Sequence, residues 1–309
     1  MSKTGCLVRV LLAMLPAACL CGQGPAPEGV GKGKRPARPD PLITFRTRHF
    51  FSAGSDFEHR QGGFSLYGGE VELSLTKRIS PRGALGLSLA RGLYRLDFQN
   101  ETDLVPGNPE PFDLLHSTTL GFSYRHIFDR RWGAMGRFSL QLGREEGGDF
   151  GDSLDGFLMA GARYQWTDDF ALSFGLVGLT RMEEHPLAFP AVMVEWNITE
   201  QLKLEMTRDL RLTCDLGGGW EVWTGLGFQG DYFRLDEDNV LPGGIVRITR
   251  VPFRLGLDWS PGGPGLRLGS YLGWSFAQEL TIWDHQGRKL QQEKREGSLE
   301  AGLRLRVSF

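Results

Sequence analysis

Apolar residues alternate with small or polar residues along most of the chain, most strictly at its C-terminal end. The apolar positions there are Leu299, Ala301, Leu303, Leu305, Val307 and Phe309. A period of two predicts an extended strand with one apolar face and one polar face. The pattern recurs over 132–143, 158–166, 251–259 and 266–276. Its second face is rich in Gly, Ser and Arg and poor in Lys, which is typical of a barrel wall that faces lipid.

The alternating segments and the turns between them predict fourteen strands, at 42–53, 63–79, 84–98, 112–128, 132–144, 154–166, 170–181, 187–198, 202–208, 210–216, 220–235, 244–259, 265–280 and 295–309. Residues 202–216 alternate without a break and could form one strand instead of two. We predict a hairpin there because single-chain bacterial barrels have an even number of strands. Twelve strands is the alternative count. The predicted fold is all-β, a single antiparallel up-and-down transmembrane β-barrel over 42–309.

The first 41 residues differ from the rest of the chain. Lys3 and Arg9 precede a short apolar run and several small residues, so 1–22 is predicted to be a signal peptide. Residues 23–41 are rich in Pro, Gly and basic residues, which predicts a short disordered linker. The cleavage position and the lipidation of Cys19 stay open at this stage. The domain division is therefore signal peptide, linker and barrel.

Short turns alternate with longer loops, as periplasmic turns and outer loops do in outer-membrane barrels. The longer loops are expected near 54–62, 99–111, 145–153, 182–186, 236–244 and 281–293. Aromatic side chains prefer the membrane interface, and those beside the short turns predict an interface girdle. Its members are Phe128, Trp132, Trp166, Phe170, Trp196, Trp220 and Trp259. The candidates for a second girdle at the outer interface are Tyr232, Phe233, Trp274, Phe276 and Trp283.

Composition and motifs exclude several classes of function. The chain has 35 Lys and Arg against 37 Asp and Glu, so nothing favours nucleic-acid binding. Its longest mostly apolar run, 10–20, is too short for a transmembrane helix. Its six histidines are scattered, and neither H-E-x-x-H nor G-x-S-x-G occurs. We therefore predict that the protein is not an enzyme, and the sequence indicates no metal site and no cofactor.

A set of charged residues falls on the polar, lumen-facing positions of the predicted strands, namely Arg125, Arg137, Arg163, Arg254, Asp258, Arg267, Arg304 and Arg306. Unpaired charge in a confined interior is costly, so a salt-bridged ladder that closes the lumen is one interpretation. A cationic constriction that selects anions is the other, because rings of Arg or Lys favour anions. Asp258, Arg267, Arg304 and Arg306 lie near the same end of adjacent strands and are the best candidates for a local network.

The terminal strand, which ends on an aromatic residue, resembles the targeting signal of outer-membrane β-barrel proteins at Leu303, Leu305, Val307 and Phe309. Together with the strand-turn-aromatic pattern at 164–170 and the strand at 189–196, it makes 42–309 similar to Gram-negative outer-membrane barrels catalogued as domains of unknown function. The resemblance implies a location in the bacterial outer membrane. The implied partners are outer-membrane lipid, lipopolysaccharide and, during biogenesis, the barrel-assembly machinery.

Two functions stay open at this stage. The first is a passive channel or transporter for small solutes. These solutes would be anions if the lumen arginines make the pore selective. The second is a closed structural or surface-interaction barrel with a salt-bridged lumen and no transport activity. The oligomeric state is also open.

Overall fold

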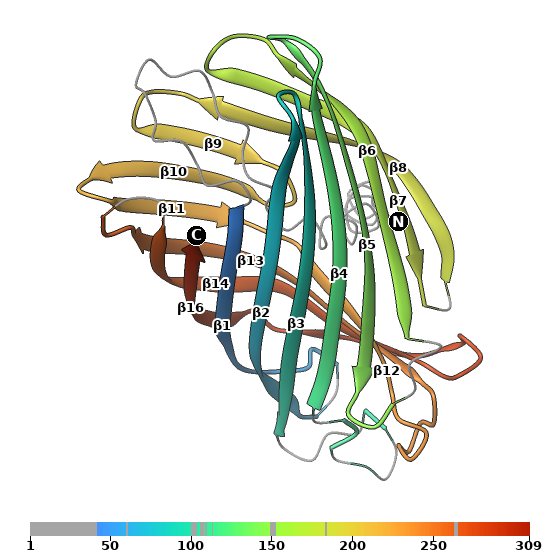
Figure 1. Ribbon diagram of the computed structural model, residues 1–309. Helices are drawn as coiled ribbons and strands as arrows, with labels where there is room; N and C mark the ends of the chain where they lie inside the picture. Colours follow the sequence, from blue (N-terminus) through green and yellow to red (C-terminus); the bar gives the residue numbers. More distant parts are fainter. Residues whose placement is uncertain are drawn as a thin grey trace, which may run out of the picture.

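A computed structural model describes residues 42–59, 61–99, 104–105, 108, 110–112, 114–148, 153–182, 184–262 and 265–309. The predicted signal peptide and linker, 1–41, lie outside these residues. The described part contains no helix long and apolar enough to cross a membrane. Its strands (Figure 1) are β1 (Leu42–Asp56), β2 (Gly63–Ser80), β3 (Gly83–Gln99), β4 (Leu114–Ile127), β5 (Trp132–Glu145), β6 (Leu154–Gln165), β7 (Phe170–Arg181), β8 (Glu184–Asn197), β9 (Leu202–Met206), β10 (Leu210–Gly217), β11 (Trp220–Leu226), β12 (Gln229–Arg234), β13 (Ile245–Trp259), β14 (Leu266–Trp283), β15 (Lys289–Arg295) and β16 (Ser298–Ser308).

These sixteen strand segments close into a barrel with fourteen positions in its wall. β11 and β12 lie one after the other along β13, and β15 and β16 lie one after the other along β14. Each of these two pairs fills one position, so sixteen segments give fourteen. β16 then pairs with β1, antiparallel, with Phe45 opposite Val307. The predicted count of fourteen strands is confirmed, and the alternative of twelve is excluded.

The hairpin predicted within 202–216 is also present. β9 pairs with β10, Leu204 lies opposite Leu212, and a tight turn around Asp209 joins the two strands. β9 has five residues and β10 has eight, whereas a tilted membrane-spanning strand needs about 9–11. The barrel wall is therefore short at this point.

Side chains alternate in exposure along the strands, as the sequence pattern predicts. On β3, Leu85, Leu87 and Leu89 are 47%, 42% and 52% exposed, and Gly86 and Ser88 between them are half-buried. Apolar side chains of other strands are exposed in the same way, among them Leu73, Phe122, Phe138, Leu158, Leu176, Val192, Leu255, Leu272 and Leu303. An exposed apolar surface on this scale is unfavourable in water. Around a closed barrel it is the surface that contacts lipid.

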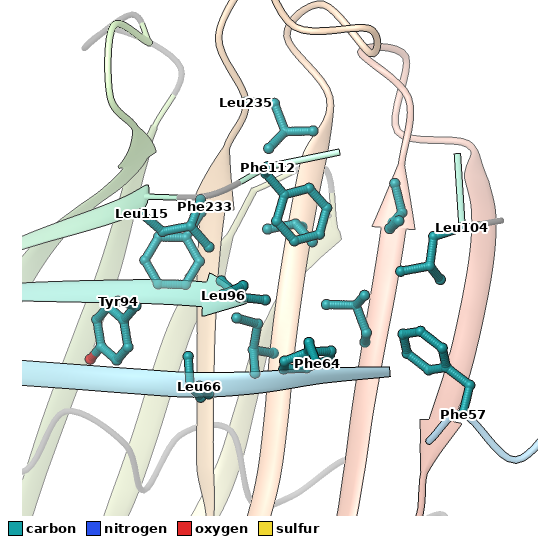
Figure 2. Packing of buried hydrophobic residues seen from close by; sticks show 14 of the residues in the cluster. Phe57, Phe64, Leu66, Tyr94, Leu96, Leu104, Phe112, Leu115, Phe233 and Leu235 are labelled. Atoms are coloured by element: carbon teal, nitrogen blue, oxygen red, sulfur yellow. The ribbon is translucent and has the colours of Figure 1, made fainter. Parts of the chain in front are cut away.

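Apolar side chains fill the end of the barrel that carries the long loops (Figure 2). Leu115, Phe233 and Val246 are 0% exposed there. The cluster brings side chains of β2, β3 and β4 against those of β12, β13 and β14, and it includes Phe64, Leu66, Tyr94, Leu96, Ile248, Leu280 and Ile282, with Phe57, Leu104, Phe112 and Leu235 from the loops. Because opposite sides of the wall meet in it, this cluster narrows the lumen at the loop end.

β12 produces this closure because it stays paired with β13 along its whole length and also reaches β5, on the other side of the barrel, at its last residue. Its last residue, Arg234, lies in parallel register with Arg144 on β5, and Figure 1 shows β12 beside the end of that strand. Gly143 permits the approach, because a Cβ atom there would overlap with the backbone carbonyl of Tyr232. The alternation of 220–235 does not predict the contact with β5, since a regular wall strand pairs only with strands next to it in the wall.

The contact of β12 with β5 also corrects the prediction of the second aromatic girdle. Tyr232, Phe233 and Trp283 are 5%, 0% and 7% exposed. They pack inside the protein because the ends of β12, β13 and β14 turn inward, so the prediction that they contact the membrane interface is wrong. Trp274 and Phe276, in contrast, are 45% and 58% exposed.

Candidate functional site: the lumen wall

The lumen-facing side chains of β10, β13, β14 and β16 form a charge network around Asp258, which is 1% exposed. Its carboxylate accepts hydrogen bonds from Arg304 Nε at 2.9 Å and from Arg211 Nη2 at 3.2 Å. Arg267 Nη1 lies 3.9 Å from the same carboxylate. The strand register explains why Asp258 and Arg304 lie close together, because Gly269 on β14 lies opposite both of them. A Cβ atom on Gly269 would overlap with the carboxylate, so this glycine leaves room for the network.

A second network lies closer to the loop end and is centred on Glu300, which is 0% exposed. Glu300 accepts a hydrogen bond from Arg254 Nε at 2.7 Å and one from Arg250 Nη1 at 3.4 Å. Arg254 also lies 5.1 Å from the ring centroid of Tyr271. A guanidinium held by a carboxylate and an aromatic face has few other orientations available. These arginines are therefore fixed parts of the wall.

Trp223 on β11 connects the arginines of the first network. The guanidinium carbons of Arg211 and Arg304 lie 4.4 Å and 4.3 Å from its ring centroid. Gly256 on β13 makes space for the indole, because a Cβ atom there would overlap with the ring. The abundance of glycine on lumen-facing positions thus has a packing reason: glycines leave room for large neighbouring side chains.

The charges are not evenly balanced around the wall. Four other ion pairs of the described wall join one cation and one carboxylate each, with Arg46–Glu72 at 3.3 Å, Arg48–Glu70 at 3.1 Å, Arg163–Glu195 at 3.3 Å and Lys203–Glu205 at 2.7 Å. In the two networks, by contrast, five arginines share three carboxylates, because Glu221 joins them through Arg267 at 2.7 Å. Five minus three leaves an excess of two positive charges among these eight groups.

A polar cavity of about 80 Å³ lies in the lumen between β12 and the strands β1 to β5. Its lining carries charges of both signs, including Arg48, Glu70, Arg137, Arg208 and Asp231. A space of this size and polarity has room for several water molecules. The lumen is therefore not filled by side chains at this level.

The inner face of β5 to β8 is apolar over part of its height, contrary to the predicted Gly, Ser and Arg face. We call its residues the apolar lumen patch, and they are Met135, Phe157, Met159, Val177, Leu179, Phe189, Ala191 and Met193. Register places them together, since Val177 lies opposite both Met159 and Phe189. They alternate with Leu158, Leu176 and Val192, which are 55%, 66% and 52% exposed on the outer face. The prediction of a polar lumen face is wrong for this part of the wall.

The residues predicted as a lumen charge cluster occupy several places. Asp258, Arg267 and Arg304 lie together, and Arg254 belongs to the Glu300 network. Arg163 on β6 forms an ion pair with Glu195 on β8. The remaining predicted members lie elsewhere on the wall. Arg306 on β16 is paired with Arg46 on β1 and with Arg267 on β14. Arg125 lies opposite Met135, and Arg137 lines the cavity. The sequence analysis did not single out Arg211, Arg250 or Trp223. Arg211 could have been found from its position on the polar face of the 210–216 alternation.

The predicted girdle and terminal positions lie on the outer surface. Exposure is 52% for Phe128, 66% for Trp166 and 65% for Phe309. Trp132, Trp196, Trp220, Trp259 and Leu303 are also exposed, whereas Phe170, Leu305 and Val307 are half-buried. Within the described residues, no three His, Cys, Asp or Glu side chains lie close enough to hold a metal ion.

A closed antiparallel barrel with an apolar outer belt and a charged lumen defines the class: the chain is an outer-membrane-type β-barrel. No family model and no curated protein matches the chain. Solved outer-membrane barrels are similar in shape. The COG4313 outer membrane channel from Pseudomonas putida F1 is 12% identical, with 91% of this chain and 100% of that chain covered and a TM-score of 0.49.

Two further solved structures are also similar to this chain. The KdgM porin is 10% identical, with 86% of this chain and 99% of that chain covered and a TM-score of 0.36. A deletion mutant of the TodX monoaromatic hydrocarbon channel is 10% identical, with 88% and 91% covered and a TM-score of 0.39. At these identities the likeness concerns the barrel fold alone, and the function of this chain has to be argued from its own residues.

Proposed function

We propose that this protein is a channel for small solutes in the bacterial outer membrane. The observation that carries the proposal is the polar cavity inside the barrel, whose wall holds guanidinium and carboxylate groups of β1, β2, β5 and β12. A fourteen-strand barrel lies between the filled eight-strand barrels and the open porins of sixteen or more strands. Its expected surroundings are outer-membrane lipid and lipopolysaccharide, with assembly by the barrel-assembly machinery.

We further propose that the channel prefers anions, although weakly. The two arginine networks have an excess of two positive charges over their carboxylates. The four one-to-one ion pairs named above add no net charge. Fixed positive charge along a narrow passage attracts anions, and pairing with Asp258 and Glu300 reduces the effect.

A second candidate function rests on a different observation. The apolar cluster at the loop end, with Leu115, Phe233 and Val246 fully buried, narrows the direct path along the barrel axis. A barrel that stayed closed in this way would be a structural or surface-interaction protein. The two candidates differ in whether current passes through the folded barrel.

Planar-bilayer recording of the mature protein, with a salt gradient across the membrane, distinguishes them. Steady current with an anion-directed reversal potential is the expected result. Replacement of Arg304 by Gln should reduce the anion preference, and Lys77→Gln, an exposed position near a short turn, serves as the control. A barrel that shows heat-modifiable mobility but no current would support the closed alternative.

A further inference from the structure

β8 has no neighbouring strand along most of one edge. It pairs with β7 from Leu187 to Trp196, but with β9 only from Val194 to Asn197. β9 and β10 are too short to continue the wall, and β12, which follows β11 along β13, lies against β5 instead of β8. In the described part of the chain, the wall is therefore open between β8 and β12.

The sequence of β8 is suited to an open edge. Asn197 N donates to Asp169 on the β7 side, and Ile198 N donates to Leu202 on the β9 side. Successive peptide N–H groups of a strand point to opposite edges, so the even-numbered residues of β8 direct their nitrogens toward the β9 side. Pro190 is one of them, and its register with β7 is regular. Proline has no N–H to donate and is confined to edges and bulges, so Pro190 faces the open side.

The opening lies at the level of the outer apolar belt. Val192 on the same strand and Leu176 on β7 are 52% and 66% exposed on the outer surface. Unpaired peptide groups at this depth cost several kcal/mol each if they face lipid tails. The unpaired peptide groups of this edge need hydrogen-bond partners, which water or the polar part of a ligand can supply. An edge that such molecules reach fits a passage between the bilayer and the lumen.

The apolar lumen patch lies directly behind this edge. Phe189, Ala191 and Met193 belong to β8 itself, and Phe157 and Val177 lie on the next two strands. Three of its eight apolar members are methionines, and Arg137 on β5, directly opposite Met159, borders the patch. Methionine side chains are flexible and polarisable and adapt to apolar ligands of different shapes.

We propose that the apolar lumen patch is a binding site for an uncharged apolar molecule, which reaches it from the bilayer through the opening between β8 and β12. The occupant is apolar because eight neighbouring side chains of the patch are apolar, with the charge of Arg137 only at its border. It comes from the membrane because the opening lies at membrane level, while the apolar cluster narrows the axial path. This inference rests on the proposed channel function and adds a second class of solute, apolar molecules, to the anions proposed for the charged path.

Photolabelling of the mature protein in liposomes tests the site. The probe is trifluoromethyl-iodophenyl diazirine, a small uncharged apolar carbene source, and mass spectrometry locates the label. Leu158, Leu176 and Val192 provide an internal standard, because they face lipid on the same strands. We expect labelling of Phe157, Val177 and Phe189 as well, and we expect excess iodobenzene to reduce only this inward labelling. A phospholipid with a diazirine at the end of one acyl chain, which remains in the membrane, tests the opening by labelling Phe189 or Ala191.

Matched variants separate binding from folding. Ala191→Asp places a carboxylate in the half-buried centre of the patch and should reduce inward labelling about tenfold, since a buried unpaired charge is strongly unfavourable. Met193→Leu keeps the patch apolar and should leave the labelling unchanged. Ser123→Asp, on the inner face of β4, is the control for a new charge elsewhere in the lumen. All variants are first checked for heat-modifiable mobility.

Inward labelling no stronger than that of Ser123 on β4 would overturn the site. Labelling by the small probe but not by the photolabile lipid would overturn the route through the wall. Inward labelling that develops only after deletion of 23–41 would make that segment the occupant and would equally contradict the proposal. Current in the planar bilayer without inward labelling would leave the channel function standing and remove only this inference.

Discussion

Removal of the Asp258 charge should destabilise the barrel markedly. Asp258→Asn keeps the shape of the side chain but leaves Arg211, Arg267 and Arg304 around a neutral group. Breaking a buried ion pair by neutralising one partner costs about 3–5 kcal/mol. The three arginine side chains are 16%, 35% and 25% exposed, so water compensates part of the loss. We therefore expect a decrease in the free energy of unfolding of about 2–3 kcal/mol.

The assay is urea unfolding of the refolded barrel in phospholipid vesicles, followed by the mobility difference between unheated and heated samples. Glu205→Gln is the matched control, because Glu205 also pairs with one cation, Lys203, but both side chains are about one-third exposed, at 29% and 34%. Its expected cost is below about 1 kcal/mol. Equal costs for the two variants, or none for Asp258→Asn, would refute the view that the Asp258 network holds β10, β13, β14 and β16 together.

Three further predictions concern glycines and one turn. Gly269→Ala should lower the free energy of unfolding by about 1–3 kcal/mol, because the new Cβ would overlap with the Asp258 network. Gly178→Ala, where a Cβ meets nothing within 4 Å, should be neutral in the same urea assay. Equal effects of the two variants would contradict this prediction. Gly143→Ala should displace β12 from β5 and raise single-channel conductance, and an unchanged conductance would show that β12 does not control the passage. Backbone N–H groups of Trp132 and Arg131 hold the pKa of Asp129 below its ordinary value of 3.8. The ionised Asp129 carboxylate therefore stabilises the fold above pH 3.8, and this stabilisation is lost as the pH falls through the lowered pKa. The stability difference between the native protein and Asp129→Asn, measured by urea midpoints, should therefore shrink below about pH 4, and a difference that grew on acidification would contradict it.

The two unusual parts of this barrel have a common structural origin. β9 and β10 are short, and β12 turns inward just after the position where they end. The inward turn supplies Phe233 to the apolar cluster that narrows the loop end, and it leaves the edge of β8 without a partner. One departure from a regular wall thus narrows the axial path and leaves the edge on which the proposed lateral route depends.

The sequence alone was sufficient for the barrel and favoured the correct strand count, and the structure excluded the alternative of twelve. A period of two is a local property, because successive side chains of a strand point to opposite faces whatever the strand packs against. For the same reason the outward positions, such as Leu85 and Leu255, could be read directly from the chain. The even number of strands expected of single-chain bacterial barrels favoured two strands over one in the ambiguous segment 202–216. The opposition of Asp258 to Arg267 and Arg304 was also accessible, because it depends on positions near the same end of neighbouring strands.

Only the tertiary structure decided what lies inside the barrel. Which arginines share a carboxylate depends on the register between strands, so Arg211 and Trp223 could not be assigned to Asp258 from spacing alone. The inward path of β12 depends on long-range packing of Phe233 and on the space at Gly143, and neither is visible in the local alternation of 220–235. The alternation shows that a residue points to one face of a strand. Whether that face meets water, lipid or another strand depends on how the wall closes, which is set by contacts between residues far apart in the sequence.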